Sequence, residues 1–147
     1  PRHRPILIKE DSLGNHLPDR DTWVSPQHRF LFSCADAQMY FEDPEFLVAA
    51  EHLTVLDGVE EVKCEQITYI HLMFERHELV LSNGVWSESF QQGGQTLSGL
   101  NDSQHKEIPE HLLKFAHDPC GPPYLTSLRT LKKVEAELLL ACGAALC

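Results

Sequence analysis

The sequence lacks the features that would place it among membrane or nucleic-acid-binding proteins. No run of 18 apolar residues occurs along its 147 residues, so it carries no signal for a transmembrane helix, and we find no signal peptide. Basic residues are scarce: 12 Lys and Arg stand against 22 Asp and Glu, a formal net charge of −10 at pH 7. Because nucleic acids and anionic lipids attract basic surfaces, we expect neither a nucleic-acid partner nor a membrane partner.

Motifs of particular catalytic chemistries are also missing. The sequence has no GxSxG, no phosphate-binding glycine loop and no paired-carboxylate motif. An odd number of cysteines without a CxxC pair favours reduced thiols over a disulfide framework; they are Cys34, Cys64, Cys120, Cys142 and Cys147. The nine histidines show neither HExxH nor the spacing of a structural zinc site. We expect no cofactor and no metal. A metal site assembled from residues distant in sequence stays open, so a His-rich metal-binding domain is kept as an alternative behind the two functions named below.

What is present indicates a mainly β fold. A chain that is 42% hydrophobic can bury a core of one domain. The strongest strand pattern covers 60–74, and Ser82-Asn83-Gly84 is typical of a type I′ hairpin turn between 77–81 and 85–90. Shorter strands are expected at 5–9, 22–24, 29–33 and 45–53, the last of them entering a helical turn.

The composition changes after residue 90. Residues 91–106 are expected to form a linker, and 107–147 a helical tail that packs on the β body (1–90), because its apolar face must be buried. Apolar residues recur at 125, 128, 131, 134, 138 and 142, which is helical spacing. Thr126 or Ser127 would cap this helix and Gly143 would end it.

One short stretch, Ser25-Pro26-Gln27-His28, brings together two groups with chemistry. Pro26 restricts the backbone, so the Ser25 hydroxyl and the His28 imidazole lie across one turn. Such a pair can polarise a peptide carbonyl and protonate a leaving amide nitrogen, which acyl transfer at a peptide bond requires. The alternative is a plain turn with Ser25 as a cap and His28 half exposed, and spacing alone favours that alternative.

Three pieces in order resemble a known family. They are "VSPQHRFL" (24–31), "ITYIHLMFERHELVLSNGVWSESF" (67–90) and a terminal pattern carried by Arg129, Leu131, Lys132, Glu135, Ala136 and Leu138. Together, over roughly residues 5–140, they resemble the Hedgehog/intein (Hint) superfamily, and most of all a bacterial subfamily found in large, often secreted proteins. The location would then be the bacterial cytoplasm or the outside of the cell, as part of a larger protein.

The resemblance implies a horseshoe-like disk of antiparallel strands and hairpins, with a C-terminal helical tail here, that acts on its own precursor in cis. In the family a Cys or Ser attacks the preceding carbonyl in an N-to-S or N-to-O acyl shift. The resulting (thio)ester is resolved by water, a second nucleophile or a sterol. His28 would be the activating histidine and Ser25 its hydrogen-bonding partner. His77 matches the late histidine, and His71 would replace an aspartate; both are also open to a purely structural role.

The sequence departs from the family pattern at two places, and each departure changes the activity that we expect. The segment that bears the nucleophile has no counterpart before Ser25, and the sequence starts with Pro1. We therefore expect a fragment, residues 1–90 being the C-terminal part of the β domain, which needs the missing segment as a partner and is inactive alone. The closing strand, 86–90, lacks the Asn of splicing members, which favours cleavage at the N-terminal junction. The alternative function is a non-catalytic β-rich interaction or structural module with a degenerate Hint scaffold.

Overall fold

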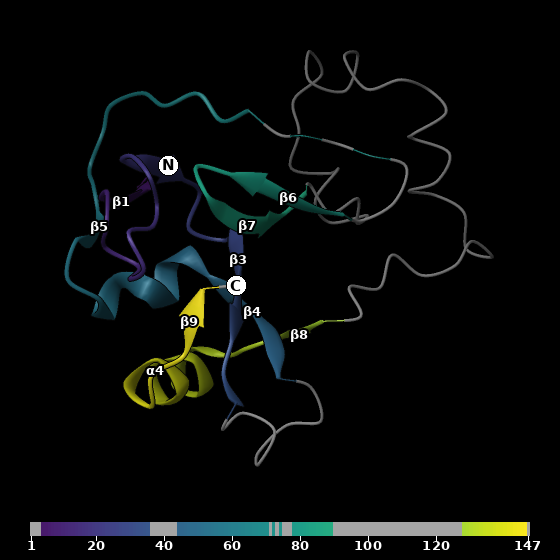
Figure 1. Cartoon of the computed structure of the whole chain (residues 1–147). Helices are drawn as coiled ribbons and strands as arrows, with labels where there is room; N and C mark the ends of the chain where they lie inside the picture. Colours follow the sequence, from purple (N-terminus) through teal and green to yellow (C-terminus); the bar gives the residue numbers. More distant parts are fainter. Residues whose placement is uncertain are drawn as a thin grey trace.

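The computed structural model of the chain describes residues 4–35, 44–70, 72, 74, 78–89 and 128–146 (Figure 1). One of its two sheets has three strands, all antiparallel. β1 (Ile6–Ile8) is central and pairs with β2 (Thr22–Val24) on one side and with β5 (Val59–Glu61) on the other. This small sheet lies beside the longer strands of the second sheet (Figure 1).

The second sheet runs in the order β6-β7-β3-β4-β8. Its strands are β6 (Leu79–Ser82), β7 (Val85–Glu88), β3 (Arg29–Ser33), β4 (Glu45–Ala49) and β8 (Arg129–Thr130). A further strand, β9 (Ala145–Leu146), pairs with β3, and the described ladders are antiparallel except that of β4 with β8. The expected mainly β class is therefore confirmed.

The core lies where β3 and β4 are covered on both faces. Their sequences, RFLFS and EFLVA, are continuous apolar runs without polar alternation, which is typical of strands buried on both sides. Phe32 and Phe46 face each other across the ladder and are each 1% exposed. β4 continues into the 3-10 helix η2 (Ala50–Val55), whose Leu53 is fully buried. The expected strand entering a helical turn at 45–53 is thus confirmed.

The β6–β7 hairpin is also confirmed by the backbone. Asn83 and Gly84 have φ values of 51° and 77°, as the two central residues of a type I′ turn require. Ser82 pairs with Val85 directly across the turn. A Cβ atom added to Gly84 would lie 2.6 Å from Leu17 Cδ2, so the end of that side chain would have to shift; the positive φ is what favours glycine here.

The C-terminal helix is shorter than the sequence indicates. α4 spans Lys133–Ala141, whereas the apolar spacing predicts a helix from about residue 125. The prediction is wrong at this end because Arg129 and Thr130 pair with Phe46 and Leu47 as strand β8. Thr126 and Ser127 lie outside the described residues. Gly143 follows the helix with a φ of 89°, which confirms it as the terminating glycine.

The segment that follows β5 departs further from expectation. Strand β5 ends at Glu61, and residues 62–70 have no regular structure, although 60–74 carries the strongest strand pattern. Ile70 is 87% exposed. Apolar alternation predicts a strand only where a neighbouring strand offers hydrogen bonds, and the described residues form no ladder with 62–70. Within the described parts of the chain, no helix is long and apolar enough to cross a membrane.

Candidate functional site

An open groove with a volume of about 960 Å³ lies beside β2 and the start of β3. Four consecutive residues, Thr22 to Ser25, line it, and so do His28, Arg29 and Phe30. The β6–β7 hairpin and residues 68–70 and 72 form other parts of its wall. The groove therefore contains Ser25 and His28, the two residues that the sequence singles out together.

The turn that carries these two residues has a defined geometry. The His28 backbone N–H donates to the Ser25 carbonyl oxygen at 3.0 Å, which closes a four-residue turn with Pro26 at its second position, where proline is favoured. Two further bonds join the turn to η2: Ala50 N–H donates to the His28 carbonyl (2.8 Å) and Glu51 N–H to the Pro26 carbonyl (3.0 Å). The Gln27 side-chain amide also donates to the Glu51 carboxylate. The turn is thus held against the buried end of β4.

The His28 ring is half buried and packs on the core. Its centroid lies 5.0 Å from that of Phe30, with an interplanar angle of 74°, an edge-to-face arrangement. Ser25 is half buried as well. An imidazole held by an aromatic neighbour at the edge of a groove can transfer a proton to or from a group bound there. A hydroxyl on the same turn can donate a hydrogen bond to a carbonyl oxygen.

A second histidine in the groove, His52, has no role in the sequence-based prediction. It lies on η2, its side chain is 17% exposed, and its Nε2 atom is 3.7 Å from Glu51 Oε1. Its Nδ1 atom is buried and has no hydrogen-bond partner among the described residues. An unpaired buried polar atom costs about 1–3 kcal/mol. Its position after the buried run of β4 is the one sequence signal that marks it.

Strand β7 and Ser89, the residue that follows it, add buried polar groups to the groove wall. Ser87, Glu88 and Ser89 are 5%, 8% and 5% exposed, and all three line the groove. Arg29 Nε donates to Glu88 Oε1 in an ion pair, and Arg29 Nη1 donates to Thr130 Oγ1 at 2.8 Å. This network ties β3, β7 and β8 together next to His28. Sequence reasoning missed it because its members are far apart in the chain.

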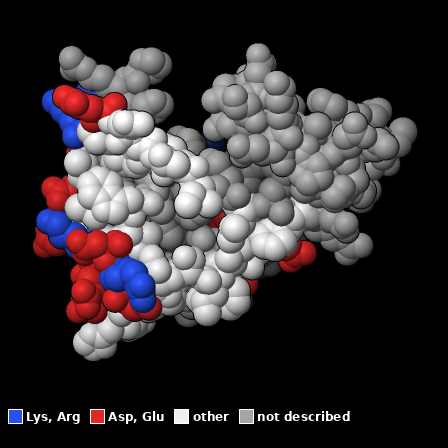
Figure 2. Space-filling model, turned by 90° about the horizontal axis from the view of Figure 1, so that it is seen from above, with Lys and Arg blue, Asp and Glu red and all other residues white. Residues whose placement is uncertain are grey.

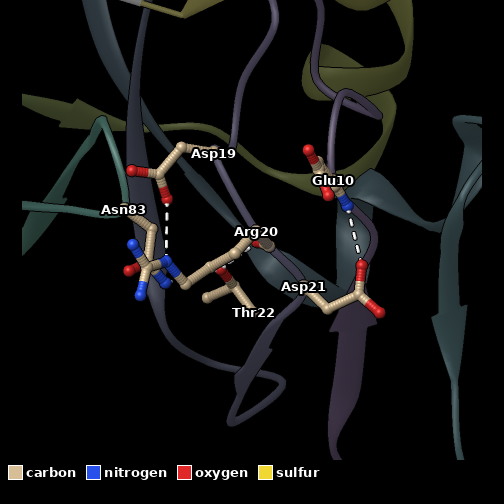
Figure 3. A network of polar contacts seen from close by, with 6 residues as sticks. All are labelled: Glu10, Asp19, Arg20, Asp21, Thr22 and Asn83. Atoms are coloured by element: carbon tan, nitrogen blue, oxygen red, sulfur yellow. Dashed lines mark hydrogen bonds and ion pairs between the residues drawn. The ribbon is translucent and has the colours of Figure 1, made fainter.

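Polar contacts between the two sheets involve residues of the groove wall. Asn83 Nδ2 donates to Thr22 Oγ1 at 2.8 Å, and the Asp19 backbone N–H donates to the Asn83 carbonyl at 3.1 Å. Figure 3 shows Asn83 next to the segment from Asp19 to Thr22, where Asp21 also accepts a bond from the Glu10 backbone N–H. These bonds hold the β6–β7 hairpin against the entry to β2.

The groove has little net charge. Its charged lining residues are Asp21, Arg29 and Glu88, and the last two neutralise each other. Burial raises the pKa of Tyr69, another lining residue, and the nearby Cys64 raises it further. Figure 2 shows that in this view the charged side chains gather on the side of the molecule where β1 and β5 lie. An ion pair there joins Lys9, which follows β1, to Glu60 of β5 at 3.0 Å.

Two of the four predicted site residues, His71 and His77, lie outside the described residues. Cys34 and Cys142 are free thiols, and none of the described cysteines, Cys64 included, lines the groove. Over the described ranges, no group of three or more His, Cys, Asp or Glu side chains comes together as a metal site.

The chain was compared with known proteins in three ways. The search of curated proteins and the search of solved structures each gave no match. The family model described as "Hint domain" matches residues 1–94, which is more than half of the chain. The matched range contains the Ser25–His28 turn, η2 and the β6–β7 hairpin that surround the groove. By this match the chain belongs to the Hint domain family.

Proposed function

We propose that the protein is a self-processing module that cleaves a peptide bond of its own precursor at the N-terminal junction through an N-to-S or N-to-O acyl shift. The observation that supports this proposal is the Ser25–His28 turn, because both residues line one groove and lie in the range that the family model matches. The peptide-bond substrate follows from membership in the Hint family. In this proposal the attacking Cys or Ser directly follows the scissile bond in the precursor, as in the Hint family.

The reaction is balanced in protons and bonds. The neutral His28 imidazole takes the proton from the attacking thiol or hydroxyl, whose sulfur or oxygen forms a bond to the carbonyl carbon. The carbon–nitrogen bond then breaks, and His28 gives the proton to the leaving nitrogen. The Ser25 hydroxyl donates a hydrogen bond to the carbonyl oxygen, where negative charge develops. The products are a (thio)ester and a free amine, and a second nucleophile resolves the ester.

The test is a cleavage assay on the complete gene product that contains these residues, carrying an N-terminal affinity tag. Release of the tag is followed by gel electrophoresis and intact mass spectrometry, with hydroxylamine added to trap the (thio)ester. His28→Ala should slow release about a hundredfold or more, as the loss of a general acid–base does. His16→Ala is the matched control, because this histidine is 96% exposed and lies outside the groove.

The possible results separate the two functions considered. Release that is lost in His28→Ala and kept in His16→Ala supports self-processing. Release at the wild-type rate in His28→Ala would refute the role given to the turn. A wild-type precursor that stays intact would refute self-cleavage itself and favour the non-catalytic interaction module.

A further inference from the structure

The edge of β2 that faces the groove carries backbone hydrogen-bonding groups directed away from β1. The direction of these groups follows from the ladder between β1 and β5. At its ends, Lys9 N–H donates to the Gly58 carbonyl and Val62 N–H donates to the Pro5 carbonyl. Residues 5 and 9 of this segment thus direct their backbone groups toward β5. Because the direction alternates along a strand, Leu7 does the same, while Ile6 and Ile8 direct theirs toward β2.

The same alternation fixes β2. Ile6 pairs with Val24 and Ile8 with Thr22, so those two residues of β2 direct their N–H and C=O groups toward β1. Trp23, between them, directs its N–H and C=O to the other side. Among the described strands, β2 pairs only with β1, and so the Trp23 backbone groups point to an open edge.

The groove runs along this edge. Side chains of successive strand residues point to opposite faces of a sheet, and yet Thr22, Trp23 and Val24 all line the groove. A groove lined by consecutive strand residues passes beside the backbone rather than over one face. Since β1 covers the other edge of β2, the groove lies along the open edge and leads directly to the Ser25–His28 turn.

The side chains that line the groove indicate which kind of ligand it can bind. Three exposed apolar side chains line the groove: Trp23 is 50% exposed, Ile70 87% and Leu72 54%. The charged lining groups include a neutralised pair, Arg29 with Glu88. A strand edge that pairs with no other described strand, beside three exposed apolar side chains, suits an extended peptide with apolar side chains.

We infer that the precursor segment carrying the scissile bond binds in extended conformation along the open edge of β2, as an added strand anchored at the Trp23 backbone. This inference rests on the proposed function and names how its substrate is held. An added strand advances about 3.3 Å per residue. If one residue of the peptide pairs with Trp23, the peptide residue two positions further along lies about 7 Å away, beside Ser25. The Trp23 backbone thus positions the bond that His28 acts on.

A proline substitution separates the backbone contact from the fold. Trp23→Pro removes an N–H that β1 does not use, and proline is tolerated on edge strands at such positions. Trp23→Val keeps the N–H but loses the indole ring. Glu61→Pro is the matched control on β5, because Glu61 lies opposite Ile6 and by the same alternation directs its N–H away from β1, at the edge remote from the groove.

In the tagged-precursor assay, Trp23→Pro should slow tag release about fivefold or more relative to Trp23→Val, the loss expected for one backbone hydrogen bond. Glu61→Pro should release the tag at the wild-type rate. Equal rates for Trp23→Pro and Trp23→Val would overturn the inference, and so would equal slowing by Glu61→Pro. Neither result would contradict the proposed function. That function is refuted only if the His28→Ala precursor still releases the tag or the wild-type precursor does not.

Hydrogen exchange gives a second readout that does not depend on turnover. In the uncleaved His28→Ala precursor the Trp23 amide should exchange more slowly than in the isolated 147-residue chain, because the added strand protects it. Equal exchange in both would overturn the inference. Protection that rises with the concentration of the isolated chain would mean that a second copy occupies the edge, and would overturn it as well.

Discussion

The buried ion pair between Arg29 and Glu88 offers a quantitative test of the packing around the groove. The Glu88 side chain is 7% exposed and the Arg29 side chain 20% exposed. Arg29 also donates to Thr130. Removal of one partner of a buried pair costs about 3–5 kcal/mol, because the other charge stays in a poorly solvated place.

The two single substitutions should differ in cost. Arg29→Met leaves the more deeply buried carboxylate without its cation, so we expect a loss of about 3–5 kcal/mol in the free energy of unfolding. Glu88→Gln leaves a guanidinium that still reaches water and Thr130, and we expect a loss of about 1–3 kcal/mol. The double variant contains neither charge of the pair. Its cost should therefore fall short of the sum by about 1 kcal/mol or more.

Equilibrium unfolding in urea, followed by far-ultraviolet circular dichroism, measures these free energies. Arg4→Met is the control, since the Arg4–Glu61 pair is 48% and 45% exposed and an exposed pair contributes about 1 kcal/mol or less. Additivity of the two single variants within about 0.5 kcal/mol would refute the coupling. A larger cost for Glu88→Gln than for Arg29→Met would refute the assignment of the stronger burial to Glu88.

Three further outcomes are expected. Leu139→Ala, at a side chain 1% exposed within the core, should lower the unfolding free energy by about 2–5 kcal/mol in urea; an unchanged midpoint would show that α4 does not pack as described. Gly84→Ala should cost about 1–2 kcal/mol, because its φ of 77° strains any other residue, with Ala144→Gly as a comparison outside the hairpin. The Lys132 backbone N–H, which donates to Glu135, lowers the pKa of that carboxyl. The ionised Glu135 carboxylate therefore stabilises the folded protein above the ordinary carboxyl pKa, and this contribution is lost as the pH falls through the lowered pKa. Glu135→Gln should therefore reduce the drop in Tm between neutral pH and about pH 3, and an identical drop would contradict this.

Local chemistry made some elements predictable from the sequence. Asn83-Gly84 predicts the β6–β7 turn because few other residue pairs adopt two successive positive φ values. Gly143 predicts the helix end for the same reason. The Ser25–His28 turn follows from Pro26 and from the likeness to the Hint family, and the family match agrees with that likeness. The roles of Ser25 and His28 stay predictions.

Long-range pairing was not predictable in the same way. Arg129 and Thr130 fit a helical pattern, and only their pairing with β4 makes them a strand. Residues 62–70 fit a strand pattern, yet no described strand pairs with them. His52 and Ser87 reach the groove from elements distant in sequence, and no local pattern relates them to His28. In each case the partner decides the outcome, and a single sequence does not name the partner.

The pairing of β9 with β3 sets an order of events during synthesis. Phe32 lies opposite Leu146, more than a hundred residues later, while the Ser25–His28 turn immediately precedes β3. On the ribosome, β3 therefore stays without β9, and Arg29 without Thr130, until nearly all of the described chain has emerged. Strand pairings between such distant residues form slowly. We expect the groove to reach its final form only after translation has passed residue 146, which delays any reaction there until the sheet is complete.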